Sequence, residues 1–81
     1  MTDDNLLTDV AESLKAEYPQ LSVHEYNQKA RLTNGSAAWY IDIYPTQSGM
    51  LMLEGERYGE RIYKRCDRDT AALLHTLRGT I

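Results

Sequence analysis

The sequence predicts a single α+β domain over residues 1–81, with two helices packed on one face of an antiparallel sheet of three or four strands. Two observations support this class. Apolar residues recur every three or four positions near both ends of the chain, as in amphipathic helices. Between these ends, short runs alternate apolar and polar residues and are separated by turn-forming residues. Each helix has one apolar stripe, so both are expected on the apolar side of the sheet, leaving the other side open.

The first helix is predicted over residues 3–18. Its apolar stripe consists of Leu6, Leu7, Val10, Ala11, Leu14 and Tyr18. Thr2 is the candidate N-cap, and the two aspartates after it suit the positive end of the helix dipole. Pro19 ends the helix, because a residue that precedes proline is disfavoured in helical geometry.

A first strand is predicted over residues 22–33, with Ala30 and Leu32 toward the core and His24 and Tyr26 on the same side. Asn34-Gly35 follows it. Both residues tolerate positive φ, so the pair indicates a two-residue type I′ hairpin into the next strand.

The strand over residues 37–45 is the clearest in the chain. Trp39, Ile41 and Ile43 alternate with Tyr40, Asp42 and Tyr44, so the two sets point to opposite faces. The first set is expected to form the sheet side of the core, and the second to line the open face.

A third strand covers residues 50–56, with Leu51 and Leu53 toward the core; the reverse choice, Met50 and Met52 inward, remains open. Residues 61–66 form either a fourth strand or the continuation of a long, bulged third strand. As a fourth strand, this segment has Ile62 inward and Tyr63 on the open face.

The final helix is predicted to begin after Asp67 or Asp69 and to run to about Arg78. Leu73, Leu74 and Leu77 belong to its apolar face, together with Ala71. Gly79 ends this helix at the position where glycine is most common.

Charge and composition limit the function classes. The net charge is −3, and the most basic stretch, residues 57–68, holds five basic and two acidic side chains. The chain has no apolar run long enough to span a membrane and no signal-peptide pattern at its acidic N-terminus, so a cytoplasmic location is expected. Cys66 is the single cysteine, which excludes an internal disulfide and indicates a small buried side chain.

No residue pattern indicates catalysis. His24 and His75 lie in distant elements without ligand-forming neighbours, so no metal site is predicted. The glycines lack the spacing of a phosphate-binding loop, and Cys66 with His75 lacks a third orienting group. We therefore expect a protein that is not an enzyme and that uses no cofactor.

The tyrosines are the most informative feature, because the chain has six of them and no phenylalanine. Tyr40, Tyr44 and Tyr63 are expected on the open face, with Arg61 and Arg65 beside them. Tyrosine and arginine are enriched at protein interfaces and their energetic hot spots. These five residues are the predicted partner-binding site, although exposed tyrosine is also common in strands simply because it favours sheet structure.

The function predicted from these features is a non-enzymatic protein-binding module whose partner is another protein or protein complex. A compact chain without catalytic residues is typical of small phage or mobile-element inhibitors of host or defence complexes. A homodimer that closes the open face on itself is a further hypothesis.

The alternative function is nucleic-acid binding through the open face and residues 57–68. The order helix, strands, helix resembles that of double-stranded RNA-binding domains. That family holds phosphates with lysines at the start of its second helix, where this chain has Asp67 and Asp69. Asp42, between Tyr40 and Tyr44, would also repel a phosphate backbone, so nucleic acid is the less favoured partner.

Overall fold

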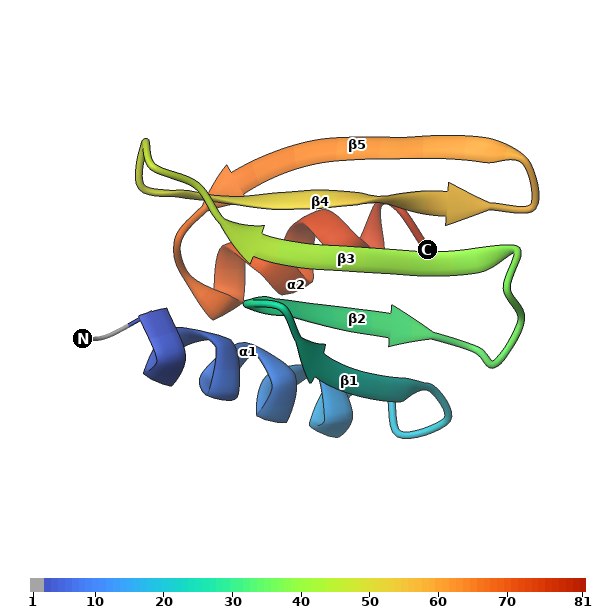
Figure 1. Cartoon of the computed structure of the whole chain (residues 1–81), viewed down its shortest axis with the longest axis horizontal. Helices are drawn as coiled ribbons and strands as arrows, with labels where there is room; N and C mark the ends of the chain where they lie inside the picture. The colour runs from blue at the N-terminus through green and yellow to red at the C-terminus, as the bar shows by residue number, and fades with distance from the viewer. Residues whose placement is uncertain (1–2) are drawn as a thin grey trace.

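The computed structural model describes the backbone of residues 3–81 and the side chains from Leu6 onward. The elements follow the order α1 (Asp3–Glu17), β1 (Ser22–Tyr26), β2 (Lys29–Thr33), β3 (Trp39–Pro45), β4 (Met50–Arg57), β5 (Glu60–Asp67) and α2 (Thr70–Arg78). The strands form one antiparallel sheet in sequence order, and both helices lie on the same side of it (Figure 1). The predicted α+β class is confirmed, with five strands instead of three or four.

The core lies between the helices and one face of the sheet. α1 contacts β1 and β2, α2 contacts β5, and the two helices contact each other. The centre of this core consists of fully buried aliphatic side chains from both helices and from the three middle strands, namely Val10, Leu14, Leu32, Ile41, Ile43, Leu51, Leu53, Leu73 and Leu77. Trp39 is also buried, as the alternation in its strand predicted.

The prediction of one strand over residues 22–33 was wrong, because the chain reverses at Asn27 and Gln28. These residues have φ of 49° and 61°, the left-handed values of a two-residue hairpin turn. Tyr26 and Lys29 flank the turn as a pair, so both point to the same face. The predicted side of His24 and Tyr26 is therefore also wrong. Both lie on the open face of the sheet, whereas Ala30 and Leu32 lie on the face that the helices cover.

Asn34-Gly35 does not form the predicted two-residue hairpin. Residues 34–38 form a longer loop, in which Gly35 has a φ of 95°. The Asn34 side chain holds this loop by accepting a hydrogen bond from the Ser36 N–H at 2.9 Å and donating one to the Tyr58 hydroxyl at 2.9 Å. Its preference for turns is thus used to order the loop through side-chain hydrogen bonds.

The two open questions about the later strands are resolved. β4 and β5 are separate strands, joined by a turn at Tyr58 and Gly59 with φ of 51° and 90°. Leu51 and Leu53 face the core, so Met50 and Met52 are on the open side, as the first of the two alternatives proposed.

The helix ends follow capping chemistry. The expected N-cap Thr2 lies outside the described residues. In α2 the N-cap is Asp69, whose carboxylate accepts hydrogen bonds from the Ala71 and Ala72 N–H groups, each at 3.4 Å. Gly79 ends α2 with a φ of −80°, so the helix stops without a left-handed residue.

Within residues 3–81, no helix has the length and apolar character that spanning a membrane requires.

Candidate functional site

The open face of the sheet carries all five residues of the predicted site. Strand alternation and pairing place Tyr40 and Tyr44 of β3 on this face together with Arg61, Tyr63 and Arg65 of β5. The same face receives further side chains from the remaining strands, among them His24, Tyr26, Lys29, Arg31, Asp42, Met52, Glu54 and Glu56. Neither helix covers this side of the sheet (Figure 1).

Arg31 and Asp42 form the most tightly held part of the face. Arg31 Nε and Nη2 donate to Asp42 Oδ1 and Oδ2 at 2.7 and 3.0 Å, a bidentate pair between β2 and β3. The guanidinium carbon also lies 4.3 Å from the centre of the Tyr40 ring and 5.3 Å from that of Tyr26. The hydrogen bonds to Asp42 raise the pKa of Arg31. Asp42 is consequently buried with its charge compensated.

A second polar chain connects β3, β4 and β5. The Tyr44 hydroxyl donates to Glu54 Oε1 at 3.0 Å, and Arg61 Nη2 donates to Glu54 Oε2 at 3.3 Å. The Lys29 ammonium lies 5.3 Å from the centre of the Tyr44 ring. Burial, followed by the hydrogen bond to Glu54, raises the pKa of the Tyr44 hydroxyl.

These contacts divide the predicted site into two parts. Tyr40 and Tyr44 are half-buried and are held by contacts within the chain. Tyr63, at 63% exposed, and the exposed side chains of Arg61 and Arg65 project from β5 on alternate residues. We call Arg61, Tyr63 and Arg65 the β5 ladder. It is the part of the site whose side chains are most available to a partner.

Tyr26 is a member of the face that the sequence prediction placed at a core-facing sheet margin. It reaches the open side only because the chain turns at Asn27 and Gln28. The asparagine is the one available signal for this turn, since Asn adopts left-handed geometry more readily than most residues.

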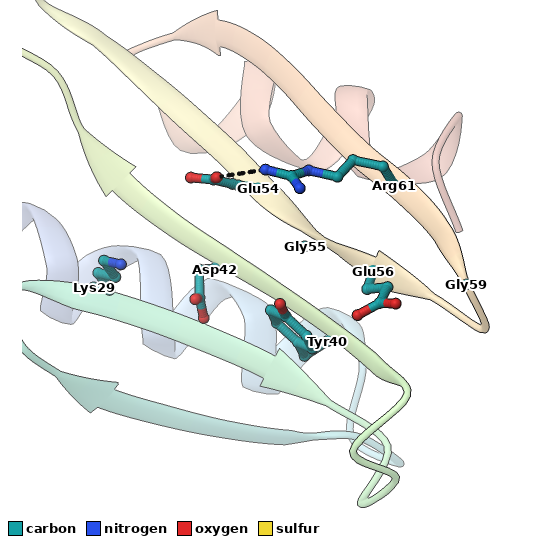
Figure 2. A pocket seen from close by; sticks show the side chains of 8 residues that line it. All are labelled: Lys29, Tyr40, Asp42, Glu54, Gly55, Glu56, Gly59 and Arg61. Atoms are coloured by element: carbon teal, nitrogen blue, oxygen red, sulfur yellow. Dashed lines mark hydrogen bonds and ion pairs between the residues drawn. The ribbon is translucent and has the colours of Figure 1, made fainter.

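A shallow hollow of about 500 Å³ lies over β3, β4 and the start of β5 (Figure 2). Its lining is mixed in charge: Lys29, Tyr40, Asp42, Glu54, Gly55, Glu56, Gly59 and Arg61. Asp42 and Glu54 are compensated by Arg31 and Arg61, while Glu56 forms no ion pair within residues 6–81. The middle strands thus contribute acids to the face, and β2 and β5 contribute cations on either side of them.

Two kinds of reactive group, metal ligands and thiols, bear on catalysis by the described residues. Across residues 3–81, no group of three or more His, Cys, Asp or Glu side chains is arranged to hold a metal ion. Cys66 is buried on the helix side of β5, where desolvation raises the pKa of its thiol and disfavours the nucleophilic thiolate.

The fold and this surface together define a two-layer α+β domain with an open sheet face of mixed charge. None of the protein-family models, curated proteins or solved structures compared with the chain matches it.

Proposed function

We propose that the protein is a non-enzymatic binding module that engages another protein through its open sheet face, with the β5 ladder as the anchor. The observation that carries this proposal is the exposure of Arg61, Tyr63 and Arg65 on the side of the sheet that neither helix covers. Residues of these types supply a large share of the energy at protein interfaces.

The surroundings of the β5 ladder favour a protein over nucleic acid. Tyr40 and Tyr44 are held by intramolecular contacts, so they provide a firm surface beside the ladder. A surface with fixed side chains loses less conformational entropy on binding. Glu56, which forms no ion pair within residues 6–81, lies in the middle of the face, where its charge disfavours a phosphate chain that crosses the strands.

We also propose that the protein belongs to the biological class predicted from the sequence, small inhibitors from phages or mobile elements. A chain of 81 residues without catalytic groups suits a small inhibitor, such as those with which phages and mobile elements block host or defence complexes in the cytoplasm. Its activity would then consist of occupying a surface of its target.

The test begins with affinity capture of partners from the native host, with and without nuclease, followed by affinity measurement with each purified candidate. The double variant Tyr63→Ser/Arg65→Ser should weaken partner binding by about 30-fold or more, the effect of losing a hot spot of about 2 kcal/mol. Both changed side chains are exposed, so circular dichroism should show an unchanged thermal midpoint.

The matched control is Glu12→Ser/Lys15→Ser, two exposed positions on α1 away from the sheet face. It should bind as the wild type does. Partner affinity that is equal in the two double variants would contradict the proposal. Light scattering on the same samples tests the homodimer hypothesis, because a dimer through the open face should dissociate in the β5 variant.

A further inference from the structure

β5 is an edge of the sheet that no other helix or strand of residues 3–81 covers. It is eight residues long, whereas the opposite edge, β1, is five residues long. No other element lies beyond β5 in Figure 1. An uncovered edge strand presents a row of backbone N–H and C=O groups that can pair with another strand.

The hydrogen-bond pattern identifies which residues present these groups. The bonds Tyr58 N–H to Ala38 O and Thr46 N–H to Met50 O set the phase of the β3–β4 ladder. In an antiparallel ladder the backbone groups alternate sides, so those of Leu51, Leu53, Gly55 and Arg57 point to β5. Their β5 partners bond inward, which leaves the backbone groups of the β5 ladder, Arg61, Tyr63 and Arg65, directed outward.

The side chains along this edge carry an excess of positive charge. Between Glu60 and Asp67, which close its two ends, β5 has Arg61, Lys64 and Arg65 and no acid. Lys64 and Arg65 are exposed and form no ion pair within residues 6–81. The Arg61 side chain is 75% exposed and reaches Glu54 only at 3.3 Å. Lys64, on the helix side, and Arg65, on the open face, are therefore available to an incoming strand, and Arg61 would exchange its exposed contact with Glu54 for an acid of that strand.

These charges discriminate between possible strands. Two copies of β5 brought side by side would place cations close to one another, which opposes self-pairing. A strand that carries acids would instead form favourable cross-strand pairs. The edge is thus suited to a partner of opposite charge and unsuited to a second copy of itself.

We propose that β5 is a strand-addition site for an extended acidic segment of the protein partner. An antiparallel segment would place acids opposite Arg65, Lys64 and Arg61, and β-branched residues opposite Tyr63 and Ile62. This inference rests on the proposed function and adds the chemistry of the partner to it. A nucleic-acid strand would satisfy the cations, but its phosphates have no N–H groups to offer the outward carbonyls of the β5 ladder.

The probe is the peptide Thr-Glu-Glu-Val-Ile-Glu-Thr, amidated at its C-terminus and labelled with fluorescein at its N-terminus, titrated with the full chain in anisotropy and followed by NMR. Binding should protect the Tyr63 and Arg65 amide protons from exchange and shift the β5 resonances most. A peptide with glutamine in place of each glutamate should bind at least about tenfold more weakly, since it loses three cross-strand charge pairs. A peptide N-methylated on its second, fourth and sixth residues, which pair with Arg65, Tyr63 and Arg61, retains the charge but cannot form the ladder, and should lose binding to a similar extent.

The protein variant Lys64→Gln/Arg65→Gln should reproduce the loss seen with the glutamine peptide, whereas Lys15→Gln on α1 should bind the peptide as the wild type does. Absence of peptide binding overturns the inference, as does binding that N-methylation leaves intact, or a single-stranded oligonucleotide that competes for β5. If Tyr63→Ser/Arg65→Ser loses partner binding and the wild type does not bind the peptide, the proposed function is supported and only strand addition is contradicted. If the wild type binds the peptide but that variant binds the captured partner with unchanged affinity, the proposed function is contradicted instead.

Discussion

At the scale of single residues, the open face combines fixed and free side chains. Asp42 points to that face, yet the two hydrogen bonds from Arg31 leave it buried and neutralised. The rings of Tyr26 and Tyr40 lie close to the same guanidinium. Removing Arg31 would leave a buried carboxylate without its partner, so this pair serves the structure of the face. The exposed cations of the open face, Arg61 and Arg65, lie on β5, and of these two Arg65 forms no ion pair within residues 6–81.

Gly55 is required by a close approach of two backbones. On β4 it pairs with Ile41, and a Cβ added there would overlap the carbonyl oxygen of Tyr40. Because the obstacle is backbone, Gly55→Ala should lower the free energy of unfolding by about 1–3 kcal/mol, as overpacking usually does. Gly79→Ala is the control, since its nearest atom would be 3.7 Å away and its φ is −80°. Urea denaturation followed by Trp39 fluorescence measures both, and equal midpoints would contradict the prediction.

Tyr44 links the stability of the fold to alkaline pH. Its pKa is raised in the folded state by burial and by the hydrogen bond to Glu54. The unfolded state therefore loses the proton first, near pH 10, and the free energy of unfolding should fall as pH rises from there through the folded pKa. Tyr44→Phe should make this decline shallower and should remove about 1 kcal/mol at neutral pH with the hydrogen bond.

The matched control for Tyr44 is Tyr63→Phe, because the Tyr63 hydroxyl makes no hydrogen bond within residues 6–81. This variant keeps the hydrogen bond between Tyr44 and Glu54, so the alkaline decline attributed to Tyr44 should persist in it. A Tyr44→Phe profile with an undiminished alkaline decline would show that other groups, such as the buried Cys66 thiol with its raised pKa, dominate this dependence.

At the scale of elements, the sequence correctly predicted the features that depend on periodicity, and its errors lie at two turns, Asn27-Gln28 and Asn34-Gly35. The helices and β3 have long, regular apolar patterns, and the structure agrees with them. The β1–β2 turn has Asn27 and Gln28 but no glycine, so the only turn signal between the two strands in the sequence is one asparagine. Asn34-Gly35 has ideal hairpin composition, yet Asn34 bonds to Ser36 and Tyr58 in a longer loop. Local preference was overridden there by contacts distant in sequence.

The same distinction explains how much of the candidate site could be predicted. Alternation alone placed Tyr40, Tyr44 and Tyr63 on the open face, as the structure has them. The division of these tyrosines into held and exposed side chains depends on register. Arg31 meets Asp42 only because β2 pairs with β3 in the register that the loop after β2 allows. Such pairings between strands leave no local pattern in a single sequence.

The contribution of the α2 N-cap, Asp69, to the stability of the fold can be tested separately. Asp69→Ala removes the acceptor of the Ala71 and Ala72 N–H groups and should lower the free energy of unfolding by about 1 kcal/mol. Asp67→Ala is the control, since Asp67 is exposed and its carboxylate caps no helix. Thermal melts followed by circular dichroism should show a lower midpoint for the first variant alone. A larger decrease of the thermal midpoint in Asp67→Ala than in Asp69→Ala would instead identify Asp67 as the N-cap.

At the scale of the whole molecule, the arrangement of charge separates two functions that share an open sheet. Base-stacking sheets bind single strands through exposed aromatic residues within a basic surface. Here the exposed cations of the open face, Arg61 and Arg65, lie on the edge strand β5, and Asp42, Glu54 and Glu56 occupy the middle strands. The net charge of −3 adds a repulsive long-range field. Within residues 6–81, the most exposed cations of the open face therefore lie along one border, on Arg61 and Arg65 of β5.

We accordingly expect no specific binding to DNA or RNA near physiological salt. Fluorescence anisotropy with single- and double-stranded probes should give dissociation constants weaker than about 1 µM, with contact to only two or three phosphates and a correspondingly shallow salt dependence. Glu54→Gln/Glu56→Gln should strengthen this weak binding, because it removes acids from the path of the strand, whereas Glu12→Gln on α1 should not. Sub-micromolar binding that falls steeply with salt and is abolished by Arg61→Gln/Arg65→Gln would contradict this expectation. The β5 ladder would then be a phosphate contact, and nucleic acid would replace protein as the partner of the open face.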